Sequence, residues 1–518
     1  MNKRALLSTV AAVTALGLVL AGCIPERDQV PSSAVPSASG NLPEATAAPA
    51  NPGDSRVYDQ QLDWSPCDDL ECATVQVPVD WTNPDGPTFG VAINRQAALN
   101  PDKRLGSLLI NPGGPGGEGL SFAEYFAVSA GKDLLDAYDV IGFDPRGVGK
   151  SGGVKCGDGA AIDAYYIPDV VIKTQADIDA ARQTFKEFTQ NCRELTGPVW
   201  ENVDTVSAVR DMDVIRSVLG DKQLNFMGFS YGTELGATYA ELYPANVGRM
   251  SLDGAVDFLL EDTQFSIDQA QGFELALGNF VQWCHQQQEC LLDGDTAAAK
   301  QQIHDMTVTA LERGYPSGQS MDVNGTLMFY GIAVTLYDQA SWSYLMQGLN
   351  EVIQDNTASI IFQLANFYLD RDPATGVYSS NSTEAFTAIS CMDTPLETPY
   401  TIKEYNEFAA AVEAAAPTLG SAYAAGIGCD GWQWEANEYV TDLDATSATG
   451  PILVVGTLND PATPIKWARS LTERLGNASL LEWDGEGHTA YGRSNQCVID
   501  AVDGYMVDGV MPSSGLVC

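Results

Sequence analysis

The sequence predicts an α/β fold with a largely parallel sheet covered on both faces, into which a mostly helical segment is inserted. Short runs rich in β-branched and aromatic residues alternate with helical patterns over the first half of the chain. After Asp257 long helical segments follow one another, and a strand pattern resumes only at Ile452. A chain of 518 residues with 45% hydrophobic residues is long enough for one large domain with such an insertion.

The expected strands cover residues 74–79, 89–94, 107–110, 140–143, 224–229, 451–456 and 479–483. We expect the first two to form an antiparallel edge. Residues 57–257 and 448–518 would then form the α/β core, and residues 258–447 a cap over the carboxyl ends of the strands, where α/β folds bind ligands. The alternative is a separate domain unrelated to the site, but connections within compact domains are normally far shorter.

The first 23 residues have the parts of an export signal. A basic start is followed by an apolar run over residues 5–20 and by Leu20-Ala21-Gly22-Cys23, which looks like a bacterial lipobox. A membrane-spanning helix is the alternative, although the run is short for a span of about 20 residues. Cys23 would become the lipidated, palmitate-bearing first residue of an extracytoplasmic protein. Residues 24–56, rich in Pro, Ala and Ser, predict a flexible tether.

Without Cys23, ten of the eleven cysteines remain, an even number suited to disulfides in an exported chain. Chain proximity and chain order suggest the pairs Cys67/Cys72, Cys284/Cys290, Cys156/Cys192, Cys391/Cys429 and Cys497/Cys518. A metal site is not expected, because the chain has three histidines and no Cys-x-x-Cys motif. The formal net charge of −41 opposes nucleic-acid binding and favours solubility outside the cell.

The strongest motif is Gly228-Phe229-Ser230-Tyr231-Gly232, which lies between an expected strand and a helical pattern. A G-x-S-x-G motif in this context is typical of a nucleophile elbow, in which glycines relieve the crowding of a sharp turn that exposes the serine hydroxyl. A plain glycine-rich turn would not require the strand before it and the helix after it. Ser230 is therefore the candidate nucleophile.

A serine hydroxyl needs a neighbouring imidazole to take its proton. His285 and His304 fall in the helical insertion, whereas His488 lies in a glycine-flanked loop after a late strand pattern. In enzymes with this elbow the acid comes between the serine and the histidine in the chain. Asp460, in the loop after residues 451–456, meets that condition, while Asp484 is too near His488 in the chain.

The oxyanion formed during acyl transfer needs N–H donors held in place beforehand. One is expected from Tyr231, the residue after the nucleophile, and the other from the loop Asn111-Pro112-Gly113-Gly114-Pro115-Gly116-Gly117, where Gly114 is the favoured donor. A second glycine-containing stretch, residues 144–151, ends in Gly-Lys-Ser like a phosphate-binding loop. That comparison fails, because Asp144 stands where the motif requires glycine.

Together these motifs resemble the secreted tripeptidyl-aminopeptidase and proline-iminopeptidase family of α/β-hydrolases. The resemblance covers most of the chain after Trp64, and Pro112, where proline iminopeptidases commonly have histidine, favours the tripeptidyl branch. It rests on Gly113-Gly114-Pro115-Gly116, Asp144-Pro145-Arg146-Gly147-Val148-Gly149-Lys150-Ser151, Ser230-Tyr231-Gly232-Thr233, Asp460-Pro461-Ala462-Thr463-Pro464 and Gly487-His488. It implies an α/β-hydrolase fold with a large helical cap, and release of short peptides from a free N-terminus without metal or cofactor.

An aminopeptidase must bind a substrate ammonium, for which carboxylates are suited. The candidates are Glu118, Glu234, Asp257, Glu261 and Asp262, although each is also explained as a solvated side chain in so acidic a chain. A carboxylesterase would use the same acyl-enzyme chemistry on acyl esters. A catalytically inactive envelope-binding lipoprotein is a further alternative, but it would be expected to lack a member of the triad. The expected partners are the substrate and, through the lipid anchor, the membrane.

Overall fold

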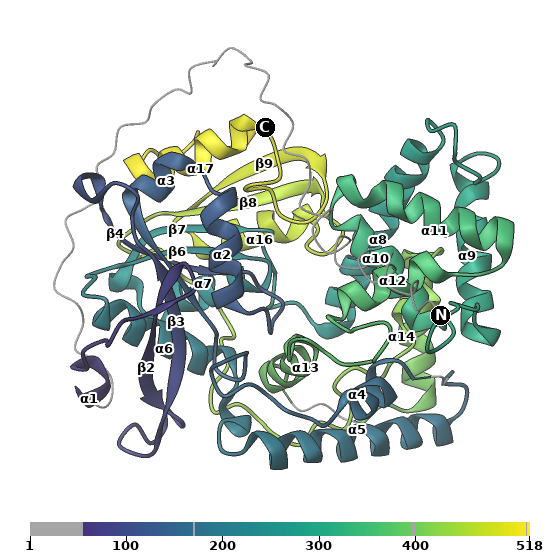
Figure 1. Ribbon diagram of the computed structural model, residues 1–518, viewed down its shortest axis with the longest axis horizontal. Helices are drawn as coiled ribbons and strands as arrows, with labels where there is room; N and C mark the ends of the chain where they lie inside the picture. The colour runs from purple at the N-terminus through teal and green to yellow at the C-terminus, as the bar shows by residue number, and fades with distance from the viewer. Residues whose placement is uncertain (1–54, 169–170, 396–398, 514) are drawn as a thin grey trace, which may run out of the picture. The chain divides into compact units, whose positions relative to one another are not determined.

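A mostly parallel sheet of ten strands is present in the part of the chain that the computed structural model describes, residues 55–168, 171–395, 399–513 and 515–518 (Figure 1). Their order is β1-β2-β3-β5-β4-β6-β7-β8-β9-β10. The strands are β1 (Ser65–Cys67), β2 (Leu70–Pro78), β3 (Thr88–Gln96), β4 (Gly106–Asn111), β5 (Tyr138–Phe143), β6 (Leu224–Phe229), β7 (Val247–Asp253), β8 (Ile452–Asn459), β9 (Ala478–Glu486) and β10 (Leu516–Val517).

The pairing confirms the expected antiparallel edge and parallel centre. β1, β2, β3 and β5 pair antiparallel in turn, and every pair from β5 to β10 is parallel. Strand β7 was not predicted, because Gly248, Arg249 and Ser251 break the apolar run of this buried strand. The short strands β1 and β10, which have three and two residues, were not predicted either.

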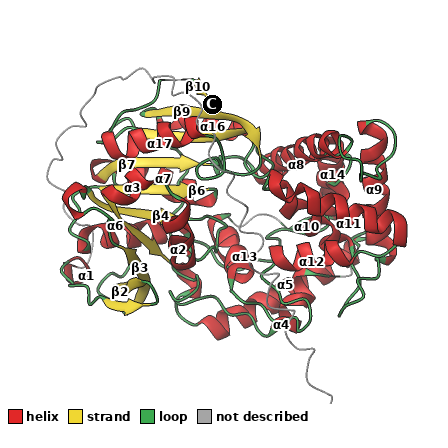
Figure 2. Cartoon of the chain, turned by 45° about the horizontal axis from the view of Figure 1, so that its top comes forward, coloured by secondary structure: helices red, strands yellow, loops and turns green. Residues whose placement is uncertain are grey.

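The helices are α1 (Ser55–Tyr58), α2 (Gly119–Ser129), α3 (Lys132–Ala137), α4 (Gly159–Tyr166), α5 (Gln175–Thr196), α6 (Thr205–Val218), α7 (Tyr231–Leu242), α8 (Asp262–Cys284), α9 (Thr296–Arg313), α10 (Gly325–Leu336), α11 (Trp342–Asp355), α12 (Ser359–Tyr368), α13 (Ser382–Asp393), α14 (Ile402–Ala415), α15 (Gly420–Tyr423), α16 (Ile465–Leu475) and α17 (Gln496–Asp508). Figure 2 shows helices in front of and behind the strands. Alternate residues of each strand face opposite layers of helices, so both faces of the sheet are apolar.

The two faces have separate hydrophobic cores. Leu108 and Ile110 of β4 pack with residues of α2, α3 and α17, while Leu109 between them packs with residues of α6, α7 and α16. Residues of the central strands are almost completely buried, as expected for a parallel sheet covered on both sides. This packing fixes the carboxyl ends of β4, β6, β7, β8 and β9, which carry the loops of the candidate site.

Helices α8 to α15 lie between β7 and β8 in the chain. Helices α8 to α12 share a second hydrophobic core, whose buried residues include Phe280, Ile332, Trp342 and Phe362. Helix α13 differs, because its residues Ala385, Ala388, Ile389 and Met392 pack in the core that contains α6 and α7. One helix of the insertion is therefore built into the α/β part of the molecule.

All five expected disulfides are present, and they link Cys67 to Cys72, Cys156 to Cys192, Cys284 to Cys290, Cys391 to Cys429 and Cys497 to Cys518. Disulfides are typical of exported proteins. Among the described residues no helix is long and apolar enough to cross a membrane. The predicted export signal, Cys23 as the predicted lipidation site and most of the predicted tether lie outside the described residues.

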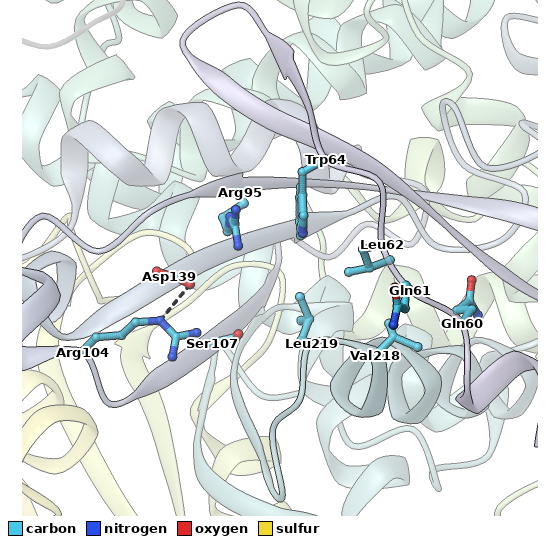
Figure 3. A pocket seen from close by; sticks show the side chains of 10 residues that line it. All are labelled: Gln60, Gln61, Leu62, Trp64, Arg95, Arg104, Ser107, Asp139, Val218 and Leu219. Carbon is cyan, nitrogen blue, oxygen red and sulfur yellow. Dashed lines mark hydrogen bonds and ion pairs between the residues drawn. The ribbon is translucent and has the colours of Figure 1, made fainter.

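A cavity of about 240 Å³ lies at the amino ends of β4 and β5 (Figure 3). The Arg95 guanidinium stacks 4.2 Å from the Trp64 ring centroid, and Arg104 pairs with Asp139 at 2.9 Å. Ser107, the second residue of β4, also lines it. The cavity is thus at the opposite end of these strands from the loops that follow them, and it is not the candidate catalytic site.

Candidate active site

The G-x-S-x-G sequence forms a sharp turn between β6 and α7. Ser230 has φ 56° and ψ −125°, a conformation that non-glycine residues rarely adopt and that is often found at active sites. The flanking glycines are needed sterically, since a Cβ on Gly228 would lie 2.2 Å from the Gly232 carbonyl oxygen. The Ser230 N–H donates to the carbonyl of Asp253 at the end of β7 (2.9 Å), which fixes the turn against the sheet.

Asp460 and His488, 28 residues apart, come together at the ends of β8 and β9. Both carboxylate oxygens of Asp460 lie 3.0 Å from His488 Nδ1. The same carboxylate accepts the N–H groups of Ala462, Thr463 and Thr489, so its orientation is fixed by the backbone on both sides. An imidazole whose Nδ1–H is bound to a carboxylate presents Nε2 as a base.

The Asp253–Gly254 segment at the end of β7 contacts both His488 and Ser230. A Cβ on Gly254 would lie 3.2 Å from His488 Cε1, and the residue before it, Asp253, accepts the Ser230 N–H. No hydrogen bond joins Ser230 Oγ to His488 within the described chain. Such bonds are often long in unliganded enzymes and tighten only with substrate.

The glycine loop after β4 lies against the serine turn. A Cβ on Gly113 would come within 2.8 Å of Ser230 Cβ and 3.0 Å of Tyr231 N. The Gly113 N–H donates to Asn111 Oδ1, but among the described residues the Gly114 and Tyr231 N–H groups donate to no protein acceptor. Gly114 is also solvent-exposed. Two unpartnered donors beside a serine match the requirements of an oxyanion hole.

The loop at residues 144–151 has a structural role. Arg146 is fully buried, with bidentate hydrogen bonds to Asp211 (2.7 and 2.8 Å) and further bonds to backbone carbonyls. Asn381, just before α13, accepts the Gly149 N–H (2.8 Å) and donates to the Gly147 carbonyl (2.9 Å). These bonds fasten α13 to the core.

Helix α13 also touches the candidate oxyanion loop, because a Cβ on Gly116 would lie 2.5 Å from the Ser382 carbonyl oxygen. At the other end of α13, Asp393 accepts the Thr205 N–H (2.8 Å) and hydroxyl (2.7 Å). Thr205 Oγ1 in turn contacts the Tyr231 hydroxyl. The helix therefore runs from the oxyanion loop to the residue that follows the nucleophile.

Two carboxylates lie together beside the serine turn. Glu234, in the first turn of α7, is partly buried and has no hydrogen-bond partner among the described residues. Burial raises its pKa well above the ordinary value, and the nearby Asp393 raises the pKa further. Burial, with the charge of Asp204 added, raises the pKa of Asp393 to about 8. Asp204 itself is buried, and its Oδ2 has no partner within the described chain.

The other predicted carboxylates have different surroundings. Glu118 precedes α2 and accepts the Ser121 hydroxyl (2.9 Å). Asp257 is buried, and Arg474 lies 3.4 Å from it. Glu261 and Asp262 are exposed at the start of α8. Of the five candidates, Glu234 is thus the one that lies one helical turn from Ser230 without a partner.

Sequence comparisons place this site in a known family. Residues 416–518 match the model of the TAP-like proteins. The chain is 34% identical to carboxylesterase B of Mycobacterium tuberculosis, with 98% of each chain covered.

The chain belongs to the TAP-like family of α/β-hydrolases.

Two further TAP-like relatives are named as peptidases. The chain is 32% identical to serine protease Hip1 of M. tuberculosis, over 98% of this chain and 96% of the relative. It is 30% identical to the tripeptidyl aminopeptidase of Streptomyces coelicolor, over 89% of this chain and 85% of the relative. The protein is therefore a serine hydrolase, as the motifs predicted.

The TAP-like site also contains residues that the sequence analysis did not identify. Asp393 ends α13, one of the helices inserted between β7 and β8, and no local pattern marks it as a neighbour of Tyr231. The Tyr337 carbonyl, just after α10, accepts the His488 N–H (2.9 Å), and its ring lies edge-on to the imidazole at 5.1 Å. Asp253 ends the strand that was missed. The contacts of Tyr337 and Asp393 join segments more than 100 residues apart, so periodicity and spacing could not reveal them.

Proposed function

We propose that this protein is an extracytoplasmic serine exopeptidase that releases short peptides, such as tripeptides, from free N-termini. The observation that carries the proposal is the Asp460–His488 pair beside the strained Ser230, with the unpartnered Gly114 and Tyr231 N–H groups next to it. A nucleophile, an oriented base and two oxyanion donors are the parts that acyl transfer requires.

In the proposed reaction Ser230 Oγ attacks the scissile carbonyl carbon while its proton passes to His488 Nε2. The carbonyl π electrons move to the oxygen, which the Gly114 and Tyr231 N–H groups stabilise. Collapse of the intermediate breaks the C–N bond, and the imidazolium gives its proton to the leaving amine. Water then adds to the acyl-enzyme carbonyl with His488 as base, the ester C–Oγ bond breaks, the imidazolium returns its proton to Ser230 Oγ, and the peptide acid leaves. Asp460 orients the imidazole throughout.

The preference for a free N-terminus rests on Glu234 and Asp393. Two carboxylates withdrawn from water and without a cation are unfavourable when both are ionised. A substrate ammonium would supply the missing countercharge and make charge-assisted hydrogen bonds. An ammonium site on α7 and α13, near the nucleophile, would limit how many substrate residues can precede the scissile bond.

A carboxylesterase is the second candidate, and it is favoured by the 34% identical relative named carboxylesterase B. An esterase needs the same triad and oxyanion donors but no ammonium site. The carboxylate pair is thus the feature that separates the two functions.

The localisation part of the proposal rests on the sequence of residues 1–56 and on the five disulfides. We propose that Cys23 carries the lipid that holds the enzyme to the outer face of the cell membrane. A Cys23→Ser variant should be released from membranes, while its activity per molecule stays the same. Tight membrane association of this variant would disprove lipid anchoring at Cys23.

The test of function compares three chromogenic substrates: a tripeptide anilide with a free N-terminus, its N-acetylated form and a short-chain acyl ester. We expect the free peptide to be cleaved about ten- to hundredfold more efficiently in kcat/KM than the acetylated one, since acetylation removes a charge-assisted hydrogen bond. Equal cleavage of both peptides would indicate an endopeptidase. Rapid turnover of the ester alone would establish the carboxylesterase.

A further inference from the structure

Asp253, the last residue of β7, contacts both catalytic loops of the proposed mechanism. Its backbone carbonyl accepts the Ser230 N–H at 2.9 Å. Its carboxylate accepts the Ala490 N–H at 3.0 Å and the Tyr491 N–H at 2.7 Å, two and three residues after His488. One residue therefore links the nucleophile turn to the loop that carries the histidine.

The Asp253 carboxylate is buried, with 1% of the residue exposed, and no lysine or arginine pairs with it in the described part of the chain. The ionisable groups that face it are His488 and Asp460. The Tyr491 phenol is directed to Asp503 instead, at 2.6 Å. A buried carboxylate without a countercharge is costly, and such groups are retained where their charge has a use.

The cation that could pair with this charge forms during the reaction. When Ser230 Oγ gives its proton to His488 Nε2, the imidazole becomes an imidazolium. Arg493, the other nearby cation, is directed to the carbonyls of Tyr337 and His488 (3.4 and 3.5 Å) rather than to a carboxylate. A charge in a water-poor site has a larger effect on such a step than the same charge in water.

We propose that Asp253 is a second positioning residue for His488, whose negative charge stabilises the imidazolium and whose two hydrogen bonds hold the loop after it. This inference rests on the proposed serine-hydrolase mechanism but not on the choice between peptide and ester. Asp460 bonds to the imidazole directly, whereas Asp253 acts through the loop backbone and through space.

The ionisation of Asp253 is consistent with this role. Burial raises the pKa of Asp253 to about 6, and the hydrogen bonds from Tyr491 and Ala490 oppose a larger rise. The carboxylate is therefore ionised at neutral pH, where the enzyme would work, and loses its charge in mildly acidic solution.

Two substitutions separate the charge of Asp253 from its hydrogen bonds. Asp253 Oδ2 accepts both the Ala490 and the Tyr491 N–H, so the amide oxygen of Asp253→Asn can keep one bond to each, while the charge and the second Ala490 contact, to Oδ1, are lost. Asp253→Ala loses the charge and both bonds. Asp139→Asn is the matched control, because Asp139 also holds a backbone N–H, that of Ala98, but at the amino end of β5.

The experiment measures the second-order rate of Ser230 modification by a fluorophosphonate from pH 5 to 9, together with the thermal midpoint of each variant. We expect Asp253→Asn at pH 8 to have a thermal midpoint no lower than that of the wild type and to react about tenfold more slowly, a loss equivalent to about 1.4 kcal/mol. The acid limb of its rate profile should move to lower pH, because the imidazole then remains neutral in more acidic solution. Asp253→Ala should react more slowly still, and Asp139→Asn should match the wild type.

Wild-type rate and midpoint in Asp253→Asn would overturn the inference and leave the mechanism intact. A slower reaction with an unmoved acid limb would also overturn the electrostatic role, since it would show loss of loop geometry alone. Failure of the wild-type Ser230 to react at any pH would overturn the serine-hydrolase mechanism and this inference with it.

Discussion

The backbone N–H of His488 donates a 2.9 Å hydrogen bond to the carbonyl of Tyr337, so a residue of the inserted helices holds the proposed general base. The Tyr337 ring also stands edge-on to the imidazole. Tyr337→Ala keeps the carbonyl and removes the ring. We expect kcat/KM to fall about tenfold, because small displacements of a catalytic group are costly. Tyr337→Phe keeps the ring and should retain most activity, and an equal loss in both variants would assign the effect to the hydroxyl.

The proposed triad should behave as one unit. Ser230→Ala and His488→Ala are each expected to lose nearly all turnover, and the double variant should be hardly worse than either. Asp460→Asn should fold normally and lose at least about a hundredfold in kcat, since the amide no longer orients the imidazole. Initial rates on an activated ester measure the turnover of all these variants, and circular dichroism is the folding control. Losses that add in the double variant would argue against a shared mechanism.

The carboxylate pair predicts a selective defect. Glu234→Gln should lower kcat/KM for the free tripeptide anilide by about ten- to hundredfold and leave the acetylated peptide unaffected. Glu261→Gln, an exposed residue at the start of α8, is the control. If Glu234→Gln slowed both peptides equally, the glutamate would serve the fold of α7 rather than recognition of the ammonium.

Recognition of the ammonium should also depend on pH. Because burial raises the pKa of Asp393 to about 8, this carboxyl is neutral below that pH and ionised above it. The kcat/KM for a free peptide should therefore rise towards pH 8, until the substrate amine loses its own proton. The ratio of free-peptide to ester kcat/KM across pH 6 to 8.5 isolates this effect. A flat ratio would exclude Asp393 from substrate binding.

The free energy of unfolding should decrease as the pH rises above about 4. Burial raises the pKa values of Asp253 and Asp503 to about 6, of Glu384 to about 7 and of Asp393 to about 8. The folded state thus binds these protons more tightly than the unfolded chain, and the stabilisation is lost as the carboxyls ionise. We expect the thermal midpoint to fall by about 5 °C from pH 5 to pH 8. A midpoint that rises over this interval would contradict the assignment.

Local sequence patterns predicted the strands that carry the chemistry and the loops that follow them. The ends of β6, β8 and β9 were expected because apolar runs lead directly into Ser230, Asp460 and the loop of His488. β7 was missed because polar residues interrupt it, and Asp253 was missed with it. Asp393 and Tyr337 could not be predicted as site residues. Their positions follow from how the inserted helices pack on the core, and the periodicity of the sequence does not reveal this packing.

The chain leaves the core after β7 and returns at β8, and these two strands are neighbours in the sheet. An insertion whose two ends lie one strand spacing apart can be replaced or lengthened without disturbing the layers beneath it. Changes in the insertion could therefore alter substrate specificity during evolution while the reaction chemistry of the core stayed constant. The exceptions are α13, which is locked to the core through Asn381 and Gly116, and the stretch at 432–445, which packs in the same hydrophobic core. Any exchange of caps between such enzymes would have to carry this helix and its docking loops across together.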